Sequence, residues 1–159
     1  MNGSALVFTV EDPRTPEVAD LVRTHLSFSH EHTPAEHVWA LGVEALTDPS
    51  ITLYGARRGG ELVGMGALRE LDPSHGEIKS MHVRRAERGA GLGQAVLDHL
   101  LGVARARGYR RVSLETGTME AFGPARRMYE HAGFTVCPPF GEYTDNEHSV
   151  CMTVVLRGD

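Results

Sequence analysis

Residues 76–108 constrain the fold most, because they read as a strand, a glycine-rich turn and a strongly periodic helix in direct succession. Apolar residues recur at helical spacing at Leu92, Val96, Leu100 and Val103. Gly108 suits the position just beyond a helix end. A strand that enters a helix in this way belongs beside a sheet that the helix covers, which predicts an α/β domain.

The remaining pattern predicts further strands and helices around this unit. We expect strands over 5–10, 51–57, 61–69, 76–83, 111–115, 134–136 and 149–156. We expect helices over 16–29, 92–107 and 124–132. A further helix is expected from Thr33 to about Asp48, because Thr33, Pro34 and Glu36 form a capping-box pattern. This order implies one domain over 1–159, with a mixed, twisted sheet flanked by helices on both faces.

Composition and charge argue against several classes of partner. The formal net charge is −5, whereas nucleic acids and anionic membranes demand basic surface. No stretch is long and apolar enough to span a bilayer. Residues 1–4 show no basic segment that leads into an apolar one, so we expect no signal peptide and a cytoplasmic protein. Cys137 and Cys151 allow one disulfide, but without a spacing motif they are more typical of reduced cytosolic thiols.

The turn from Arg88 to Gly93 has the chemistry of an anion site. The first turn of a helix offers unpaired N–H groups and a partial positive charge. Gly89, Gly91 and Gly93 let the backbone approach a phosphate closely. Arg88 adds charge-assisted hydrogen bonds to the same anion. These features predict a cradle for a pyrophosphate group.

Other phosphate-binding patterns fit the turn less well. A Walker P-loop needs Gly-Lys-Ser/Thr, which is absent after these glycines. A dinucleotide fingerprint fails in both frames, which end at Gln94 and Val96. Glu115 does stand about where a ribose-binding acid would be, so an NAD(P)-dependent oxidoreductase remains an alternative. A nucleotide- or acyl-CoA-binding module without catalysis is the other alternative.

A third phosphate-binding pattern, Arg-x-x-Gly-x-Gly, is matched by Arg88, Gly91 and Gly93. Residues 125–134 match Ala-x-x-x-Tyr-Glu-x-x-Gly-Phe. Over roughly residues 51–156 the chain resembles the GNAT superfamily of N-acetyltransferases, and more narrowly a branch of bacterial acetyltransferases. The resemblance implies a mostly antiparallel sheet, acetyl-CoA as cosubstrate without a metal, and direct acetyl transfer to an amine of a small molecule or protein. Family members are often dimers, so the resemblance also allows a homodimer, although nothing in the sequence identifies an interface.

The resemblance assigns contacts to the coenzyme. The residues concerned are Met81, His82, Val83, Arg88, Gly89, Ala90, Gly91, Leu92, Gly93, Gln94, Phe122, Ala125 and Tyr129. It implies that backbone groups of 81–83 pair with the pantetheine arm like an added strand, and that one N–H polarises the thioester carbonyl. Phe122 stands where many relatives carry an asparagine, so either apolar packing replaces that contact or another residue supplies it.

Catalytic residues are expected on two strands and one helix. Glu77 is the first choice for the base, usually acting through water in the family, with Glu115 as its rival on the neighbouring strand. Strand alternation puts Glu77 and Lys79 on one face with Met81 and Val83. The resemblance places the hydroxyl of Tyr129 near the coenzyme sulfur, as the acid.

The acceptor is expected to meet His25, Glu115 and Tyr143, and acidic residues there favour a cationic amine. Residues 30–34 begin a His-Glu-x-x-His pattern, but Pro34 occupies the second ligand position, so we expect no metal site.

Overall fold

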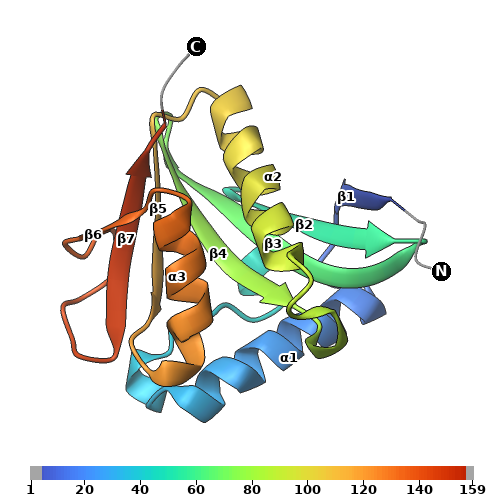
Figure 1. The fold of residues 1–159 in the computed structure, drawn as a ribbon, viewed down its shortest axis with the longest axis horizontal. Coiled ribbons are helices and arrows are strands. Elements are labelled where there is room, and N and C mark those ends of the chain that lie inside the picture. Colours follow the sequence, from blue (N-terminus) through green and yellow to red (C-terminus); the bar gives the residue numbers. More distant parts are fainter. Residues whose placement is uncertain (1–4, 157–159) are drawn as a thin grey trace.

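The computed structural model describes residues 5–156, which form an open seven-stranded sheet with α-helices packed against it (Figure 1). The strands are β1 Leu6–Val10, β2 Ile51–Arg58, β3 Glu61–Asp72, β4 His75–Val83, β5 Arg111–Gly117, β6 Thr135–Cys137 and β7 Ser149–Val155. The helices are α1 Pro16–His32, α2 Leu92–Ala106 and α3 Gly123–His131. Residues 1–4, on which the expectation about a signal peptide rests, lie outside the described residues. Within 5–156, no helix has the length and apolarity needed to cross a membrane.

The sheet is mixed and mostly antiparallel, as expected. Its strand order is β1-β2-β3-β4-β5-β7-β6, and β4 and β5 form the one parallel pair among the described strands. Their pairing ends at Ile78 and Leu114, although β4 continues to Val83 and β5 to Gly117. The two strands therefore diverge in the middle of the sheet (Figure 1).

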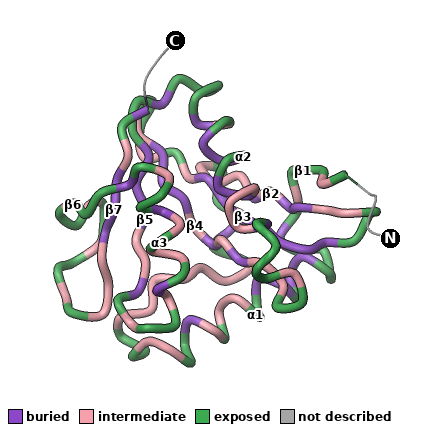
Figure 2. The backbone as a smooth tube through the Cα atoms, in the orientation of Figure 1, coloured by how far each residue is buried: buried purple, intermediate pink, exposed green. Residues whose placement is uncertain are grey.

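Helices cover both faces of the sheet, because β2 and β3 are apolar on both sides. On one face Leu62 and Met65 pack with Leu21 of α1. On the other, Val63 and Leu68 pack with α2 and with part of α3. Figure 2 shows the buried backbone running through the central strands and the inner side of α2. The position of α1 on its own face leaves it free to form one wall of the site described below.

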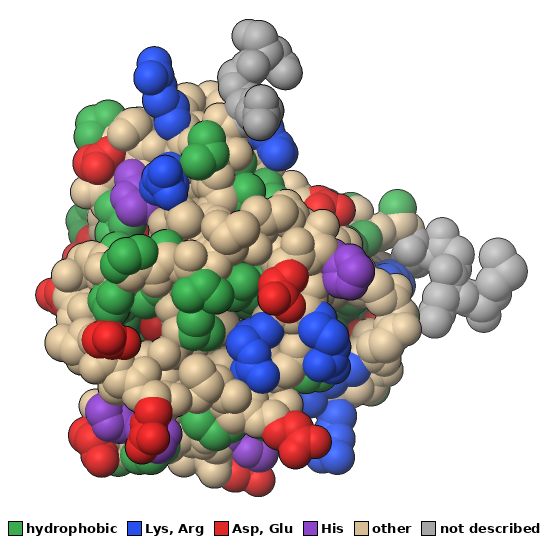
Figure 3. Space-filling view, turned by 60° about the vertical axis from the view of Figure 1, so that its left-hand side comes forward, with side chains coloured by type: hydrophobic (Ala, Val, Ile, Leu, Met, Phe, Trp, Pro, Cys, Tyr) green, Lys and Arg blue, Asp and Glu red, His purple; other side chains and the backbone are tan. Residues whose placement is uncertain are grey.

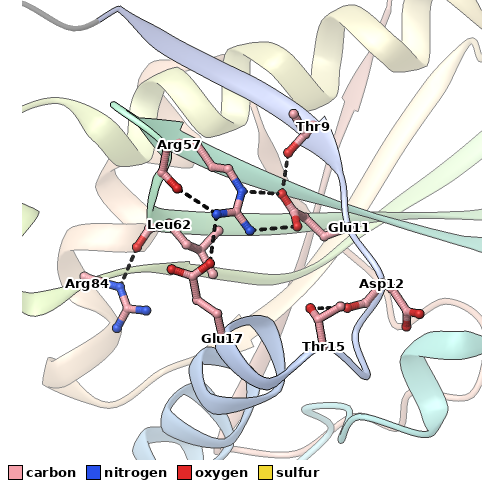
Figure 4. A network of polar contacts seen from close by, with 9 residues as sticks. Thr9, Glu11, Asp12, Thr15, Glu17, Arg57, Leu62 and Arg84 are labelled. Carbon is pink, nitrogen blue, oxygen red and sulfur yellow. Dashed lines mark hydrogen bonds and ion pairs between the residues drawn. The ribbon is translucent and has the colours of Figure 1, made fainter.

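Arg57 of β2 fixes the N-terminal segment to the sheet (Figure 4). Its guanidinium donates to both carboxylate oxygens of Glu11, at 2.8 and 3.0 Å, and to Glu17 of α1 at 2.8 Å. Such forked, charge-assisted pairs are strong hydrogen bonds. The hydrogen bond from Arg57 is the main cause that lowers the pKa of Glu11. The start of α1 is thus tied to β2.

The helix expected from Thr33 to about Asp48 was wrong. The segment instead contains two short 3-10 turns, Ala35–His37 and Ala45–Thr47. Residues 38–40 are part of a cavity wall, whereas Leu41 and Leu46 pack into the core beside α1. A capping box favours a helix start, but tertiary packing decides whether the helix continues. Residues 38–46 must line the cavity at one end and fill the core at the other, and these two requirements outweigh the preference of the capping box for a helix.

The expectation that Glu77 and Lys79 share a face with Met81 and Val83 was also wrong. Between Met65 and Ala67 the β3–β4 register shifts, so that Ser80 and Met81 together oppose Gly66. Ser80 has a φ of 56°, which is uncommon for a residue with a side chain. This β-bulge turns Met81 and Val83 toward α2, where both pack against the core.

Candidate functional site

A cavity of about 580 Å³ lies where β4 and β5 diverge. Its walls come from α1, the C-terminal half of β4, the N-terminus of α2, the end of β5 and α3. Residues 37–40 and the segment before β7 complete it. The cavity therefore combines parts of the chain that are far apart in sequence, at the one interruption of the sheet.

One wall is the glycine-rich turn and the start of α2. Gly89 and Gly91 have φ values of 85° and 80°, and no atom lies within 4 Å of the place where a Cβ would project. Gly91 is the N-cap of α2 and offers no side-chain cap, and the first helical bond runs from Ala95 N–H to the Gly91 carbonyl at 3.1 Å. The N–H groups of the first turn are therefore available to an anion.

Arg88 adds positive charge to the same wall. Its guanidinium carbon lies 5.7 Å from the centre of the Phe28 ring, and its Nε donates weakly to the Val83 carbonyl at 3.4 Å. Arg126 has a different role, since it donates to the carbonyls of Gly117 and Met119 at 2.6 and 3.1 Å. Arg88 together with the open glycine turn forms a positively charged wall with free N–H groups, which is the chemistry that a pyrophosphate needs.

The β4 edge from Lys79 to Val83 forms the floor of the cavity. Within the described residues it has no strand partner on the side of β5, because the pairing ends at Ile78. An extended ligand can therefore bond to this backbone as an added strand would. Met81, His82 and Val83 all contribute to the wall.

His82 meets His25 of α1 across the cavity wall. Their Nδ1 atoms lie 3.0 Å apart, so one ring donates a hydrogen bond to the other. Burial lowers the pKa of His25 to about 3, and burial with nearby Arg88 lowers that of His82 to about 4. Both rings are therefore neutral near pH 7. Across residues 5–156, no group of three or more His, Cys, Asp or Glu side chains is arranged to hold a metal ion.

Glu77 is buried in a polar cluster with Lys79 and Tyr143. Its side chain is 2% exposed, and it accepts a hydrogen bond from the Tyr143 hydroxyl. Lys79 Nζ lies 3.2 Å from Glu77 Oε2 and donates to the Tyr143 hydroxyl at 2.5 Å. Lys79 and Tyr143 line the cavity, whereas Glu77 does not. The carboxylate expected to act as base thus lies behind these two side chains.

Glu115 and Tyr129 both line the cavity. Burial, reinforced by the charge of Glu77 and opposed by Lys79, raises the pKa of Glu115 to about 7. Burial is the main cause that raises the pKa of Tyr129, and the nearby Glu115 carboxylate adds to it. The Tyr129 hydroxyl lies 3.8 Å from Met81 Sδ. The cavity wall therefore holds a carboxylate that titrates near neutrality beside a phenol that stays protonated.

The structure brings most of the predicted site residues together. The cavity wall includes His25, Met81, His82, Val83, Arg88, Gly89, Gly91, Leu92, Gly93, Gln94, Glu115, Phe122, Ala125, Tyr129 and Tyr143. Ala90 and Glu77 are the two predicted residues that lie outside this wall. Phe122 stacks edge-on against Phe28, with ring centroids 5.4 Å apart, and covers Gly117, where a side chain would overlap its ring. Apolar packing therefore occupies the position of the asparagine that many relatives carry.

Phe28, Trp39 and Lys79 are among the wall residues that sequence reasoning missed. Phe28 is on α1, seven residues after Leu21 and therefore on the same side of the helix, and Trp39 lies in the segment wrongly expected to be helical. Lys79 was noticed only as a neighbour of Glu77 in the strand pattern. Trp39 could have been found from the sequence, because it is the only tryptophan of the chain and follows a cluster of histidines.

Comparisons with known proteins agree with this geometry. The sequence model of the acetyltransferase (GNAT) family matches residues 15–134. The uncharacterized N-acetyltransferase YsnE of Bacillus subtilis is 45% identical over 92% of this chain and 97% of its own. The uncharacterized N-acetyltransferase YedL of Escherichia coli is 37% identical over 94% and 96%. A GNAT family acetyltransferase from Elizabethkingia anophelis, solved with acetyl-CoA bound, superposes with a TM-score of 0.71 at 18% identity, over 95% of this chain and 98% of that one.

Proposed function

The chain belongs to the acetyltransferase (GNAT) family and is an N-acetyltransferase that uses acetyl-CoA. We propose that it passes the acetyl group directly to a primary amine, with Glu115 as the proton acceptor. The observation that carries this proposal is the position of Glu115 and Tyr129 in one cavity wall, at the divergence of β4 and β5.

Acetyl-CoA supplies the acyl group as a reactive thioester, and the proposal assigns its parts to separate walls. The N–H groups at the start of α2, with Arg88, hold the pyrophosphate. The free edge of β4 from Lys79 to Val83 orients the pantetheine arm and offers an N–H to the carbonyl oxygen. Phe122 and Ala125 of the opposite wall exclude water from this arm.

Glu115 is proposed as the base because it reaches the cavity. A primary ammonium must lose a proton before its nitrogen can attack, and a carboxylate with a pKa of about 7 accepts that proton near neutral pH. Glu77, the first choice from sequence, stays a prediction for a base that acts indirectly. Its contacts support a positioning role instead, since it holds Lys79 and the Tyr143 hydroxyl in place.

Tyr129 is proposed as the acid. Its raised pKa keeps the hydroxyl protonated at neutral pH, so the proton is available to a thiolate leaving group. Its only hydrogen-bond partner among the described residues is the weak acceptor Met81 Sδ. The hydroxyl is thus free to turn toward a stronger acceptor.

The alternatives receive no support. A dinucleotide-binding oxidoreductase needs a largely parallel sheet, whereas the described sheet has one parallel pair. We propose further that the acceptor is cationic, because Glu115 lines the cavity and the carboxylate of Glu77 lies behind Lys79. On the face drawn in Figure 3, Asp and Glu side chains lie both among the His side chains at the lower left and beside the Lys and Arg side chains near the centre. The acceptor is a small-molecule or protein amine, and we expect a cytoplasmic protein for which a homodimer is one possible assembly.

The test is a two-substrate kinetic experiment. Release of free coenzyme A thiol is followed while acetyl-CoA and each of a panel of primary amines are varied, and the acetylated amine is identified by mass spectrometry. The proposal expects intersecting initial-rate patterns and faster turnover with amines that carry a second positive charge. Parallel patterns would indicate an acetylated enzyme, and thiol release without an acetylated amine would contradict amine transfer.

A further inference from the structure

The two cysteines of the chain lie directly opposite each other in the sheet. Cys137 of β6 and Cys151 of β7 are register partners in an antiparallel pair. Opposite residues project to the same face, with Cα atoms about 4.5–5.5 Å apart. A disulfide needs a Cα separation of about 4.4–6.8 Å, so the backbone already satisfies this requirement. Both thiols are free in the structure, and their spacing in sequence gave no sign of the pairing.

The pair stands at the base of a functional segment. Residues 138–148 connect β6 to β7 and contribute Tyr143 and His148 to the cavity wall. β6 has three residues and is the outermost strand, held by β7 on one side. Cys151 is also the register partner of Glu115 on β5. Cys137, Cys151 and Glu115 therefore lie side by side across three neighbouring strands, and Glu115 belongs to the cavity wall. A bond between the cysteines would close the loop that forms the acceptor wall.

We propose that Cys137 and Cys151 form a reversible cross-strand disulfide that fixes residues 138–150 against the sheet, with a low-molecular-weight disulfide as oxidant. Cys137 is the more accessible thiol and reacts first. Its deprotonated sulfur attacks the small disulfide, one small thiol leaves, and a mixed disulfide remains on Cys137. The deprotonated Cys151 then attacks the Cys137 sulfur and releases the second small thiol. Two protein thiols are oxidised, one small disulfide is reduced to two thiols, and protons balance, because each leaving thiolate takes up one proton.

The surroundings of the thiols set the character of this bond. Burial raises the pKa of Cys137 and raises that of Cys151 to about 11. Few thiolates are present at neutral pH, so the bond forms slowly there and faster in alkaline solution. The environment does not stabilise the thiolates, and stabilised thiolates are what make a disulfide easy to reduce. The bond is therefore slow to form and persistent afterwards.

The test is oxidation of the full-length protein with glutathione disulfide at pH 7 and pH 9. We expect an intact mass lower by two hydrogen atoms, loss of iodoacetamide labelling after denaturation, and faster formation at pH 9. The Tm should rise by several degrees, and hydrogen exchange should slow over residues 138–150. Dithiothreitol should reverse all of these changes.

Cys137→Ser is the matched control, since it removes the accessible thiol with little change in volume. It should show neither the mass loss nor the rise in Tm. A stable glutathione adduct on Cys137, or two thiols that remain open to labelling, would overturn the proposal. These readouts require no acetyl transfer, so they stay independent of the proposed function.

Discussion

In the proposed chemistry, Glu115 accepts a proton and Tyr129 donates one, and both side chains line the same cavity. The pKa of Glu115 is raised to about 7, whereas burial and the charge of Glu115 keep Tyr129 protonated. Pairs of groups whose surroundings push their pKa values apart are typical of acid–base sites. The two side chains come from β5 and α3, so the fold and not local sequence brings them together.

Tyr129→Phe tests the donor. It should lower kcat by about 100-fold, in the range that general acid catalysis contributes, while the Kd of acetyl-CoA changes little. The measurement is steady-state turnover with calorimetric binding of acetyl-CoA. Tyr109→Phe is the control, because that buried hydroxyl donates to Glu70 away from the cavity and its loss should leave kcat unchanged. Unchanged turnover in Tyr129→Phe would remove the acid role.

In the proposed site, helices and strands position the coenzyme through backbone geometry more than through side chains. The start of α2 presents free N–H groups because Gly91 reaches a left-handed conformation. The bulge at Ser80 and Met81 sends consecutive parts of β4 to opposite faces of the sheet. Lys79 therefore stays in the polar cluster with Glu77, while Met81 packs toward Tyr129.

Gly91→Ala tests the helix start. A side chain in the left-handed region costs about 1–2 kcal/mol, so we expect a lower free energy of unfolding and weaker binding of coenzyme A. Gly102→Ala is the matched control within the same helix, where no atom would meet the new Cβ. It should stabilise the protein by roughly 0.5–1 kcal/mol and leave coenzyme binding intact. Chemical denaturation and calorimetry give both quantities; equal effects of the two variants would contradict the assignment.

The sequence predicts elements whose local pattern and packing agree. The helix from Leu92 and the glycine turn before it were found, because periodicity, capping and glycine positions all indicate the same boundary. The mostly antiparallel character of the sheet came from the family resemblance, and no strand order was predicted. The helix predicted over residues 33–48 does not form, because packing of this segment on two sides outweighs the preference of the capping box. The bulge at Ser80 was missed although it shifts the apolar alternation of β4 by one residue, from Ile78 to Met81 and Val83.

At the scale of the whole molecule, the site exists because the sheet is interrupted once. β4 and β5 separate after Ile78 and Leu114, and helices from both faces close around the gap. Glu115 was expected at the edge shared with Glu77, yet the separation exposes Glu115 to the cavity and leaves Glu77 behind Lys79 and Tyr143. Sequence alone indicates the candidates, whereas the divergence of the strands distinguishes between them.

Thermal unfolding tests this arrangement with acetyl-CoA, coenzyme A, NAD, NADP and ATP added separately. A ligand at about 100 times its Kd adds about 2.7 kcal/mol to the free energy of unfolding. For a chain of this size that corresponds to a rise in Tm of roughly 5–10 °C. We expect the rise with both forms of coenzyme A and not with the other three. A selective shift with NAD or NADP would mean that the glycine turn binds a dinucleotide.

The pH dependence of kcat/KM in the wild type, Glu115→Gln and Glu77→Gln tests the central claim most directly. Because the pKa of Glu115 is raised to about 7, it is protonated and inactive as a base below that pH and ionised above it. We expect the wild-type rate to rise through pH 7. Glu115→Gln should lose this inflection and about 100-fold in rate. Glu77→Gln should keep the inflection at a lower pH, since the Glu77 charge helps to raise that pKa. Loss of the inflection in Glu77→Gln, with Glu115→Gln unaffected, would contradict the account.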